Sequence, residues 1–262
     1  MKIGFFGGDR RVTSAMEYLK MRGIDCVGFG IDGGVDLSEM TDLDAAVLPW
    51  PCEKGGFLNA PALKTPVTVA QIAARIPPCI PVIGGPSSVS FARFFDLSRN
   101  EALKARNAVS TAEGALALLV NASPRTVNGL PCLVTGYGAV GKRLARVLSA
   151  LGAKVTVAAR NENVLQTVAN RYCVQHLGCL RWQEPGAVFN TVPAPVLGRE
   201  FLGSLPADTL LFELASAPGG YDRNAADALG FSVIDAPGIP GKTAPVTAGE
   251  DLAKTVIGIL DQ

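Results

Sequence analysis

The feature that most constrains the fold is a glycine turn between an apolar run and an amphipathic run. The apolar residues Leu133-Val-Thr135 lead into Gly136-Tyr-Gly-Ala-Val-Gly141, and an amphipathic segment follows over 140–151. In a strand–turn–helix unit the first glycine allows the bend, the second lets a pyrophosphate approach, and the third lets helix and strand pack closely. The N–H groups at the helix N-terminus attract the anion. The pattern predicts a dinucleotide-binding unit.

The next strand carries the residues that select the cofactor. A strand is expected over 154–158, after Gly152, and the residue that reads the ribose should lie at its carboxyl end. NAD-binding proteins usually carry Asp or Glu there, whereas this chain has Ala159-Arg160-Asn161. Because no acid is present for the 2′-hydroxyl and Arg160 suits a 2′-phosphate, we predict NADP. The alternative for Arg160 is a solvated arginine at a strand end.

Composition excludes several classes of protein. The 262 residues suit two small domains or one large one, with 48% hydrophobic and only 18% charged residues. A net charge of +1 gives no electrostatic case for binding nucleic acid or an anionic membrane. No apolar run reaches the length of a membrane span, and the short apolar start predicts a first strand, not a signal peptide. We expect a cytoplasmic protein.

Cysteine and histidine usage gives no sign of metal binding. The six cysteines form no CxxC pair, so we expect mostly buried, reduced thiols. The single histidine, His176, lies in a predicted strand and is expected to be structural. No metal site is predicted.

The α/β rhythm predicts two domains. Strands are expected at 3–6, 25–29, 45–48 and 81–85, with helices at 13–21 and 69–76, and one or two connecting helices at 100–120. Further strands at 172–176, 187–190, 209–213 and 231–235 complete a six-stranded sheet before a terminal helix at 250–260. We therefore predict an α/β fold with two doubly wound parallel-sheet domains. Residues 1–121 form a flavodoxin-like substrate domain with the connecting helix, and residues 122–262 form a Rossmann NADP-binding domain with the C-terminal helix.

Ligands of such sheets bind beyond the carboxyl ends of the strands. Thr191, Val192 and Pro193 follow the fourth strand of the second sheet, where Thr191 would bond the carboxamide and its neighbours would pack on the nicotinamide ring. A simple proline turn is the alternative. The predicted cofactor-binding residues are Gly136, Tyr137, Gly138, Ala139, Val140, Gly141, Ala159, Arg160, Asn161, Thr191, Val192, Pro193 and Ala215.

Six segments together carry a resemblance to a known family. They are Gly7-Gly-Asp-Arg10, Asn107-Ala-Val-Ser-Thr-Ala-Glu-Gly114, the turn at 136–141, Asn190-Thr-Val-Pro193, Glu213-Leu-Ala-Ser-Ala-Pro-Gly-Gly220 and, most specific, Pro237-Gly-Ile-Pro-Gly-Lys-Thr-Ala-Pro-Val-Thr-Ala-Gly249. With them the chain resembles, over nearly its whole length, the family that forms the A-type subunit of dipicolinate synthase. One departure is Glu213, where the family pattern leads us to expect aspartate.

The resemblance implies an NADP-dependent oxidoreductase that acts during sporulation. Its substrate would be dihydrodipicolinate, or the 4-hydroxytetrahydro form, and its product dipicolinate. The flavoprotein-like B-type subunit of dipicolinate synthase would be the partner, in the mother-cell cytoplasm, and a homo-oligomer is left open. Two other functions compete: another NADP-dependent dehydrogenase of the hydroxyacid or shikimate type, and a non-catalytic NADP-binding regulatory protein.

A dicarboxylate substrate needs donors at both of its carboxylates. Arg10 is the first choice, with its neighbour Arg11, because arginine pairs bidentately with a carboxylate. The predicted substrate-binding residues are Arg10, Ser87, Ser88, Thr111, Ser216 and Lys242. A plain surface arginine, a serine N-cap of a helix at 89–95, and a solvated lysine in a stiff loop at 237–249 are the alternatives. The proton acceptor is expected among Asp9, Glu113 and Lys242.

Overall fold

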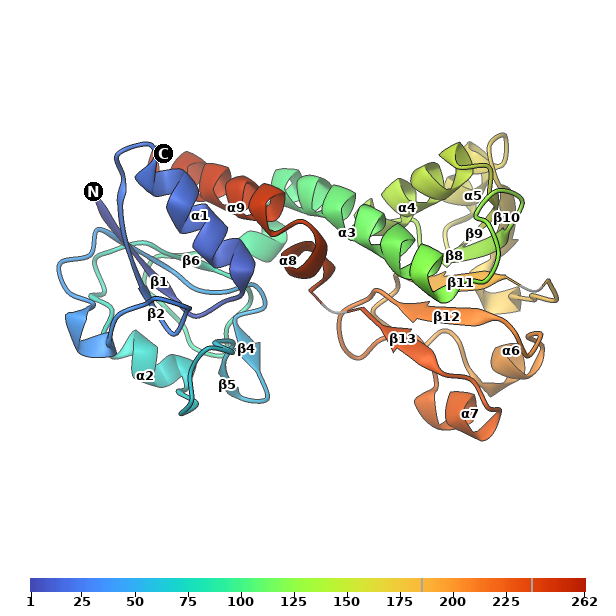
Figure 1. The fold of residues 1–262 in the computed structure, drawn as a ribbon, viewed down its shortest axis with the longest axis horizontal. Helices are drawn as coiled ribbons and strands as arrows, with labels where there is room; N and C mark the ends of the chain where they lie inside the picture. Colours follow the sequence, from blue (N-terminus) through green and yellow to red (C-terminus); the bar gives the residue numbers. More distant parts are fainter. Residues whose placement is uncertain (185, 237) are drawn as a thin grey trace. The chain divides into compact units, whose positions relative to one another are not determined.

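The computed structural model describes residues 1–184, 186–236 and 238–262, which form two compact units (Figure 1). Unit 1 comprises Met1–Asn107 and Pro240–Gln262, and unit 2 comprises Ala108–Ile239. The boundary differs from the predicted division after residue 121 in two ways. The connecting helix is shared between the units, and the C-terminal helix belongs to unit 1.

Unit 1 is built on a parallel sheet in the order β2-β1-β3-β6-β7. Leaving aside a small separate hairpin, this is the 2-1-3-4-5 order of flavodoxin-like folds, as predicted. The strands are β1 (Lys2–Phe6), β2 (Asp25–Phe29), β3 (Ala45–Val47), β6 (Val82–Gly84) and β7 (Phe94–Asp96), and the hairpin is β4 (Glu53–Lys54) with β5 (Phe57–Leu58).

Alternation along the strands of unit 1 builds a core on each face of its sheet. Ile3 and Phe5 of β1 pack with α1 (Arg10–Lys20) and α9 (Pro245–Leu260), whereas Phe6 packs on the opposite face with α2 (Val69–Ala73). In Figure 1, α1 and α9 lie side by side, and theirs is the most extensive contact between two helices of the unit. The short 3₁₀ turns are η1 (Leu37–Glu39) and η2 (Leu97–Arg99).

The close packing of α1 and α9 explains why the last helix joins unit 1. A Cβ atom on Gly249 would lie 2.5 Å from the Arg11 carbonyl oxygen and 2.6 Å from Ser14 Cβ, so only glycine allows this approach. Arg106, in the first part of α3 (Glu101–Ala122), forms an ion pair with Asp251 at 3.0 Å. Sequence periodicity predicts a helix but not the sheet that it covers, hence the wrong assignment of this helix.

Unit 2 contains the predicted six-stranded sheet, in the order β10-β9-β8-β11-β12-β13. This is the 3-2-1-4-5-6 order of a Rossmann fold. The strands are β8 (Pro131–Thr135), β9 (Lys154–Ala159), β10 (Cys173–His176), β11 (Ala187–Asn190), β12 (Leu210–Glu213) and β13 (Val233–Asp235), all parallel.

Helices cover both faces of the sheet in unit 2. Cys132 and Val134 of β8 face the core shared with α4 (Ala139–Ala150) and the second part of α3, whereas Leu133 faces the core beneath α6 (Arg199–Gly203) and α7 (Arg223–Ala228). The remaining short elements are α5 (Glu162–Val168) and η3 (Leu177–Cys179).

Two predicted local structures are wrong. No helix begins at Ser87 or Ser88, because residues 89–93 are irregular and β7 follows. The expected loop at 237–249 is mostly helical, with α8 (Ile239–Thr243) followed directly by α9, which has Pro245 as its first residue. Proline at that position is compatible with a helix, since its missing N–H would be unbonded there in any case. Pro237 itself lies outside the described residues.

Cysteine burial is only partly as predicted. Cys26, Cys52 and Cys132 are buried, whereas Cys79, Cys173 and Cys179 are exposed, and all six are free thiols. Burial raises the pKa of Cys26 to about 11 and the pKa values of Cys52 and Cys132 to about 12. In the described part of the chain, no helix is long and apolar enough to span a membrane.

Candidate functional site

The glycine turn of unit 2 has the geometry predicted from its spacing. Gly136 has φ +88°, and a Cβ atom there would lie 2.5 Å from Thr191 Oγ1. A Cβ atom on Gly141 would collide with the Gly136 carbonyl oxygen. The first glycine is therefore required by its conformation and the third by the close approach of α4 to the turn.

The N-terminus of α4 is open to an anion. Its N-cap is Gly138, and no side chain caps it. Gly138 and Ala139 are exposed, and a Cβ atom on Gly138 would find nothing within 4 Å. The N–H groups of the first turn have no partners within the helix. Donors and open space thus fit the pyrophosphate of a dinucleotide.

The carboxyl end of β9 leaves one cation available for a ligand. The guanidinium of Arg160 is exposed and has no hydrogen-bond or ion-pair partner among the described residues. Ala159 is buried, and the Asn161 side chain caps α5 by accepting from the N–H of Asn163 at 2.9 Å. His176 Nε2 lies 3.2 Å from the Arg160 carbonyl oxygen, which agrees with a structural role for this histidine.

Tyr137 borders the same turn. Its ring packs edge-on against Tyr172 at a centroid distance of 6.5 Å, and the Lys142 ammonium lies 5.8 Å from the ring centre. Partial burial, followed by the nearby Tyr172, raises the pKa of the Tyr137 hydroxyl. The phenol therefore stays neutral and can donate a hydrogen bond at physiological pH. Val140, in the first turn of α4, is half-buried.

The loops after β11 and β12 provide the remaining predicted cofactor contacts. Thr191 Oγ1 donates to the Thr135 carbonyl oxygen at 2.7 Å, so this hydroxyl already has a partner. Val192 is half-buried and Pro193 is exposed. The N–H of Ala215 donates to Glu213 Oε1 at 3.0 Å. Sequence reasoning did not select Asn190 and Glu213, the buried residues that hold these loops.

Unit 1 has its own glycine turn after β1, with a different helix cap. Gly7 and Gly8 have φ +75° and +110°, and the Asp9 carboxylate caps α1 by accepting from the Arg11 N–H at 3.1 Å. The Arg11 guanidinium returns to the same carboxylate, with Nε 2.8 Å from Oδ1 and Nη2 2.9 Å from Oδ2. A negative charge therefore occupies this helix N-terminus.

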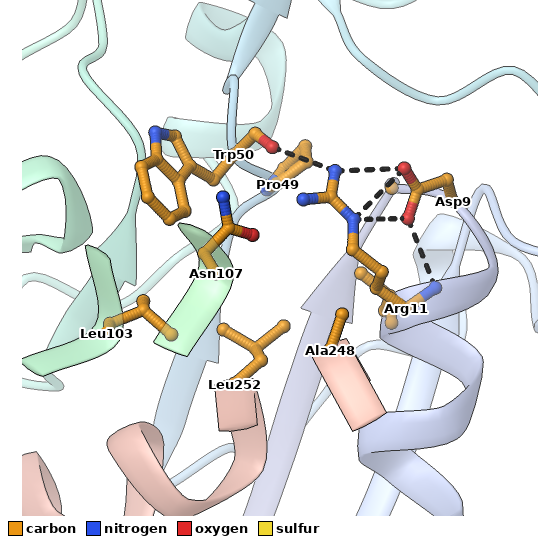
Figure 2. A pocket seen from close by; sticks show the side chains of 10 residues that line it. Asp9, Arg11, Pro49, Trp50, Leu103, Asn107, Ala248 and Leu252 are labelled. Carbon is orange, nitrogen blue, oxygen red and sulfur yellow. Dashed lines mark hydrogen bonds and ion pairs between the residues drawn. The ribbon is translucent and has the colours of Figure 1, made fainter. Parts of the chain in front are cut away.

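Figure 2 shows the pocket behind this ion pair. Arg11 Nη2 also donates to the Trp50 carbonyl oxygen at 3.0 Å, which fixes the guanidinium between α1 and the loop after β3. Asn107 and Leu103 of α3 and Leu252 and Ala248 of α9 complete the wall. The free volume is about 30 Å³, about that of one water molecule, so a ring-sized ligand does not fit this pocket.

A larger pocket, of about 230 Å³, lies on the other side of the turn. Exposed Arg10 and the acids Asp9 and Asp32 supply its charged lining, together with Thr13. Asp9 is already paired with Arg11, so Arg10 is the lining cation that remains for a ligand. The two arginines considered from sequence thus separate: Arg11 is fixed by protein contacts and Arg10 faces open space.

The predicted serines do not share the pocket beside Arg10. Ser87 Oγ accepts from the Val89 N–H at 3.0 Å, and Ser87 lines a separate open hollow with Arg99. Ser88 donates through both its N–H and its hydroxyl to Glu53 Oε1, at 2.8 and 2.7 Å. Ser88 is therefore occupied by a neighbouring carboxylate.

The remaining predicted residues are distributed over both units. Lys242 of α8 is exposed and has no hydrogen-bond or ion-pair partner among the described residues. The adjacent Gly241 packs on Asp9, since a Cβ atom there would lie 2.6 Å from Oδ2. In unit 2, Thr111 is buried, whereas Glu113 and Ser216 are exposed. Glu113 is therefore not the costly buried acid that a helix of small residues suggested.

Comparison with known proteins gives a consistent result over the whole chain. No protein-family model matches it. The chain is 28% identical to the A-type subunit of dipicolinate synthase of Bacillus subtilis (strain 168), over 99% of this chain and 96% of that protein. The crystal structure of the corresponding dipicolinate synthase subunit from Bacillus halodurans has a TM-score of 0.88 at 26% identity and covers 100% of this chain and 98% of that one.

A second solved structure, the A chain of dipicolinate synthase from Bacillus subtilis, has a TM-score of 0.83 at 28% identity, with 100% and 96% of the two chains covered. A transhydrogenase from Sinorhizobium meliloti, 15% identical over 98% of this chain and 94% of that one, has a TM-score of 0.68. The latter likeness shows the fold alone. The resemblance and the fold class expected from the motifs are both confirmed.

Proposed function

We propose that this chain, which matches the A-type subunit of dipicolinate synthase over its whole length, binds NADP on unit 2 and oxidises a cyclic dicarboxylate to dipicolinate. The observation that carries the proposal is the uncapped N-terminus of α4 at Gly138, with the unpaired Arg160 at the end of the adjacent strand. Together they offer backbone donors for a pyrophosphate and a cation for a 2′-phosphate. The name of the relatives supplies the product.

The choice of NADP over NAD rests on the charge at the end of β9. A ribose 2′-hydroxyl calls for an acceptor, usually a carboxylate, and 159–161 offers none. The Asn161 side chain is occupied as the cap of α5, which leaves Arg160 as the group that can contact a 2′ substituent. A free guanidinium favours a phosphate there over a hydroxyl.

When bound, the nicotinamide would accept a hydride from the substrate ring. The chain's own residues bind and orient: the 136–141 turn would hold the pyrophosphate, and Thr191, Val192, Pro193 and Ala215 would border the nicotinamide end. Because loss of hydride, with water from the hydroxylated form, leaves an aromatic ring, much of the driving force comes from the substrate. Positioning and exclusion of water would then suffice as the protein's contribution.

Cations selected from sequence would bind the substrate carboxylates. Arg10 borders a pocket of about 230 Å³, and Lys242 carries an unpaired amine on α8, which packs on Asp9 through Gly241. We favour these two over Ser88, whose donors are used by Glu53. Ser87, Thr111 and Ser216 remain secondary candidates. Of the three proposed proton acceptors, Lys242 is preferred, because Asp9 is held by Arg11 and Glu113 is exposed.

The test is turnover by the purified chain. Freshly generated dihydrodipicolinate and its 4-hydroxytetrahydro precursor would be supplied with NADP, and NADPH would be followed at its near-ultraviolet absorbance. The proposal expects turnover that yields dipicolinate, with NAD a poorer acceptor. Oxidation of a hydroxyacid or of shikimate instead would assign another dehydrogenase activity.

The relatives are named as one subunit of a synthase, so we also propose a partner, the flavoprotein-like B-type subunit. The same assay with that partner added separates three outcomes. A rate that rises with the partner supports a two-subunit enzyme, and an unchanged rate supports an independent one. NADP binding without turnover in either condition would favour a regulatory role.

A further inference from the structure

Three polar side chains end three adjacent strands of unit 2 at the same level. The strand register pairs Asn190 of β11 with Thr135 of β8 on one side and with Glu213 of β12 on the other. All three are buried, with exposed fractions of 0% for Thr135 and Asn190 and 5% for Glu213. This row lies at the carboxyl edge of the sheet, where Rossmann folds bind their ligands.

Hydrogen bonds connect the row from end to end. Thr135 Oγ1 donates to Asn190 Oδ1 at 2.7 Å, and Asn190 Nδ2 donates to Glu213 Oε1 at 2.6 Å. The Glu213 carboxylate also accepts from the N–H groups of Ala215, at 3.0 Å, and Gly220, at 2.7 Å. None of the ion pairs among the described residues includes Glu213. A buried acid is therefore satisfied by neutral amides alone.

A carboxylate at this place is not needed to fill a core. Desolvating an acid is costly, and apolar residues of similar volume often stabilise a fold better than buried charges do. What the carboxylate does is collect three donors from two loops. Gly219 and Gly220 are shaped around it, because Cβ atoms there would meet the Glu213 carboxylate at 2.8 Å and the Asn190 amide at less than a contact distance.

The row fixes the loops after β11 and β12. The Asn190 side chain accepts from the Val192 N–H at 3.1 Å and donates to the Val192 carbonyl oxygen at 2.9 Å, so the loop at 191–193 has one defined path. Glu213 does the same for 215–220 through Ala215 and Gly220. The Rossmann order places the pyrophosphate turn on β8 and the adenine ribose on β9, so the nicotinamide half extends toward β11 and β12.

We infer that Glu213 is a positioning residue for the nicotinamide half of the cofactor. The inference rests on the proposed function, because it needs the dinucleotide to bind unit 2 across its switch point. Glu213 would act through Val192 and Ala215, without touching the adenine half. Its loss should therefore weaken one half of the cofactor's contacts and spare the other.

The test compares two ligands on the Glu213→Gln variant. A glutamine amide can accept two of the three hydrogen bonds but turns an N–H₂ group toward a remaining donor, so one loop must shift. We expect NADPH to bind about tenfold more weakly, as for the loss of one charged hydrogen bond. Adenosine 2′,5′-bisphosphate, which carries only the adenine half, should bind within about twofold of the unchanged chain. The fluorescence enhancement of bound NADPH should also fall.

Two further variants separate positioning from stability. Glu213→Asp keeps the charge and should retain more NADPH affinity than Glu213→Gln; if the glutamine variant does not fold, a selective loss of NADPH binding in Glu213→Asp supports the inference. Val155→Ala, near the amino end of β9, removes buried methyl groups and should lower stability without changing the ratio of the two affinities.

The outcomes also separate this inference from the proposed function. If the unchanged chain binds neither ligand, the proposed function fails. If it binds both, and the Glu213 variants weaken both equally or neither, the positioning role is overturned.

Discussion

The two units begin with the same strand–glycine–helix arrangement and finish it in opposite ways. After β8 the helix N-cap is Gly138, which offers no side chain, and the space above it is open. After β1 the N-cap is Asp9, whose carboxylate occupies the helix N-terminus and is held there by Arg11 at 2.8 Å. One turn can accept an external anion, while the other already contains its own.

The difference shows that a glycine turn alone does not make a phosphate site. Free N–H groups and the helix dipole attract anions at both turns, but a capping aspartate satisfies and neutralises them from within. The residue at the N-cap therefore separates a cofactor site in unit 2 from a structural turn in unit 1. Four predictions test this comparison.

The largest effect is expected when the cap of unit 1 is copied into unit 2. Gly138→Asp places a carboxylate at the N-terminus of α4, where it would compete with the pyrophosphate and repel it. Gly138 has φ −77° and ψ −163°, which aspartate adopts without strain, so the fold should be retained. We expect NADPH affinity to fall by about 3 kcal/mol or more, measured by fluorescence titration.

Gly138→Asn is the matched control, since it adds a side chain of the same shape without the charge. It should weaken NADPH less than aspartate does. Equal losses for the two variants would mean that steric hindrance, not charge, separates the two turns.

The second effect concerns the cation beside the open turn. Arg160→Ala should weaken NADPH by about 1.5–3 kcal/mol, the range of a hydrogen bond to a charged group, and leave NADH nearly unchanged. Arg146→Ala, an exposed arginine on α4, is the control for a general loss of positive charge. Losses of the same size for both cofactors would contradict a contact to the 2′-phosphate.

A third prediction uses buried thiols as reporters of each unit. Cys52 in unit 1 and Cys132 in unit 2 are both buried with pKa values raised to about 12, so at pH 8 both are mostly protonated and react only on opening. NADPH at ten times its dissociation constant should stabilise unit 2 by about 1.4 kcal/mol. Alkylation of Cys132 should slow about tenfold, with that of Cys52 changed little.

The alkylation experiment is read by peptide mass spectrometry, with exposed Cys79 and Cys173 as internal standards for intrinsic reactivity. Equal protection of Cys52 and Cys132 would mean that the cofactor stabilises both units together. Protection of Cys52 alone would move the cofactor to unit 1.

The smallest effect is expected from removing the cap of unit 1. Asp9→Ala deletes the acceptor for the Arg11 N–H and leaves the guanidinium without its partner, so the free energy of unfolding should fall by about 1–2 kcal/mol. Asp9→Asn keeps the cap and should cost less. Chemical denaturation gives the stability and NADPH titration serves as the control. A loss of NADPH affinity as large as the one expected for Gly138→Asp would break the distinction between the turns.

Much of the fold was predictable because local patterns carry it. The alternation of short apolar runs with amphipathic runs indicated the two parallel sheets, and the Gly136–Gly138–Gly141 spacing indicated the turn. The assignment of α9 was not predictable, because it depends on which surface accepts Gly249, a contact between residues more than two hundred positions apart in the chain. The loop expected around Lys242 was likewise misjudged, since proline at the first position of a helix resembles a helix breaker.

The candidate site divides along the same line. The residues of the α4 turn and Arg160 follow from spacing, because each lies at a fixed distance from the glycines. Glu213 and Asn190 carry no motif of their own, and their partnership appears only when the register sets β11 beside β12. Arg10 and Arg11 are adjacent and chemically identical, so only the turn of α1 decides that Arg11 meets Asp9 and Arg10 faces solvent.

The most direct test of the account is a calorimetric titration of the unchanged chain with NADPH and then with NADH. The account predicts one NADPH site per chain, because of these two turns the one after β8 is open and the one after β1 is capped, and it predicts affinity for NADH weaker by about tenfold or more. Two equivalent sites per chain, or NADH bound as tightly as NADPH, would contradict it.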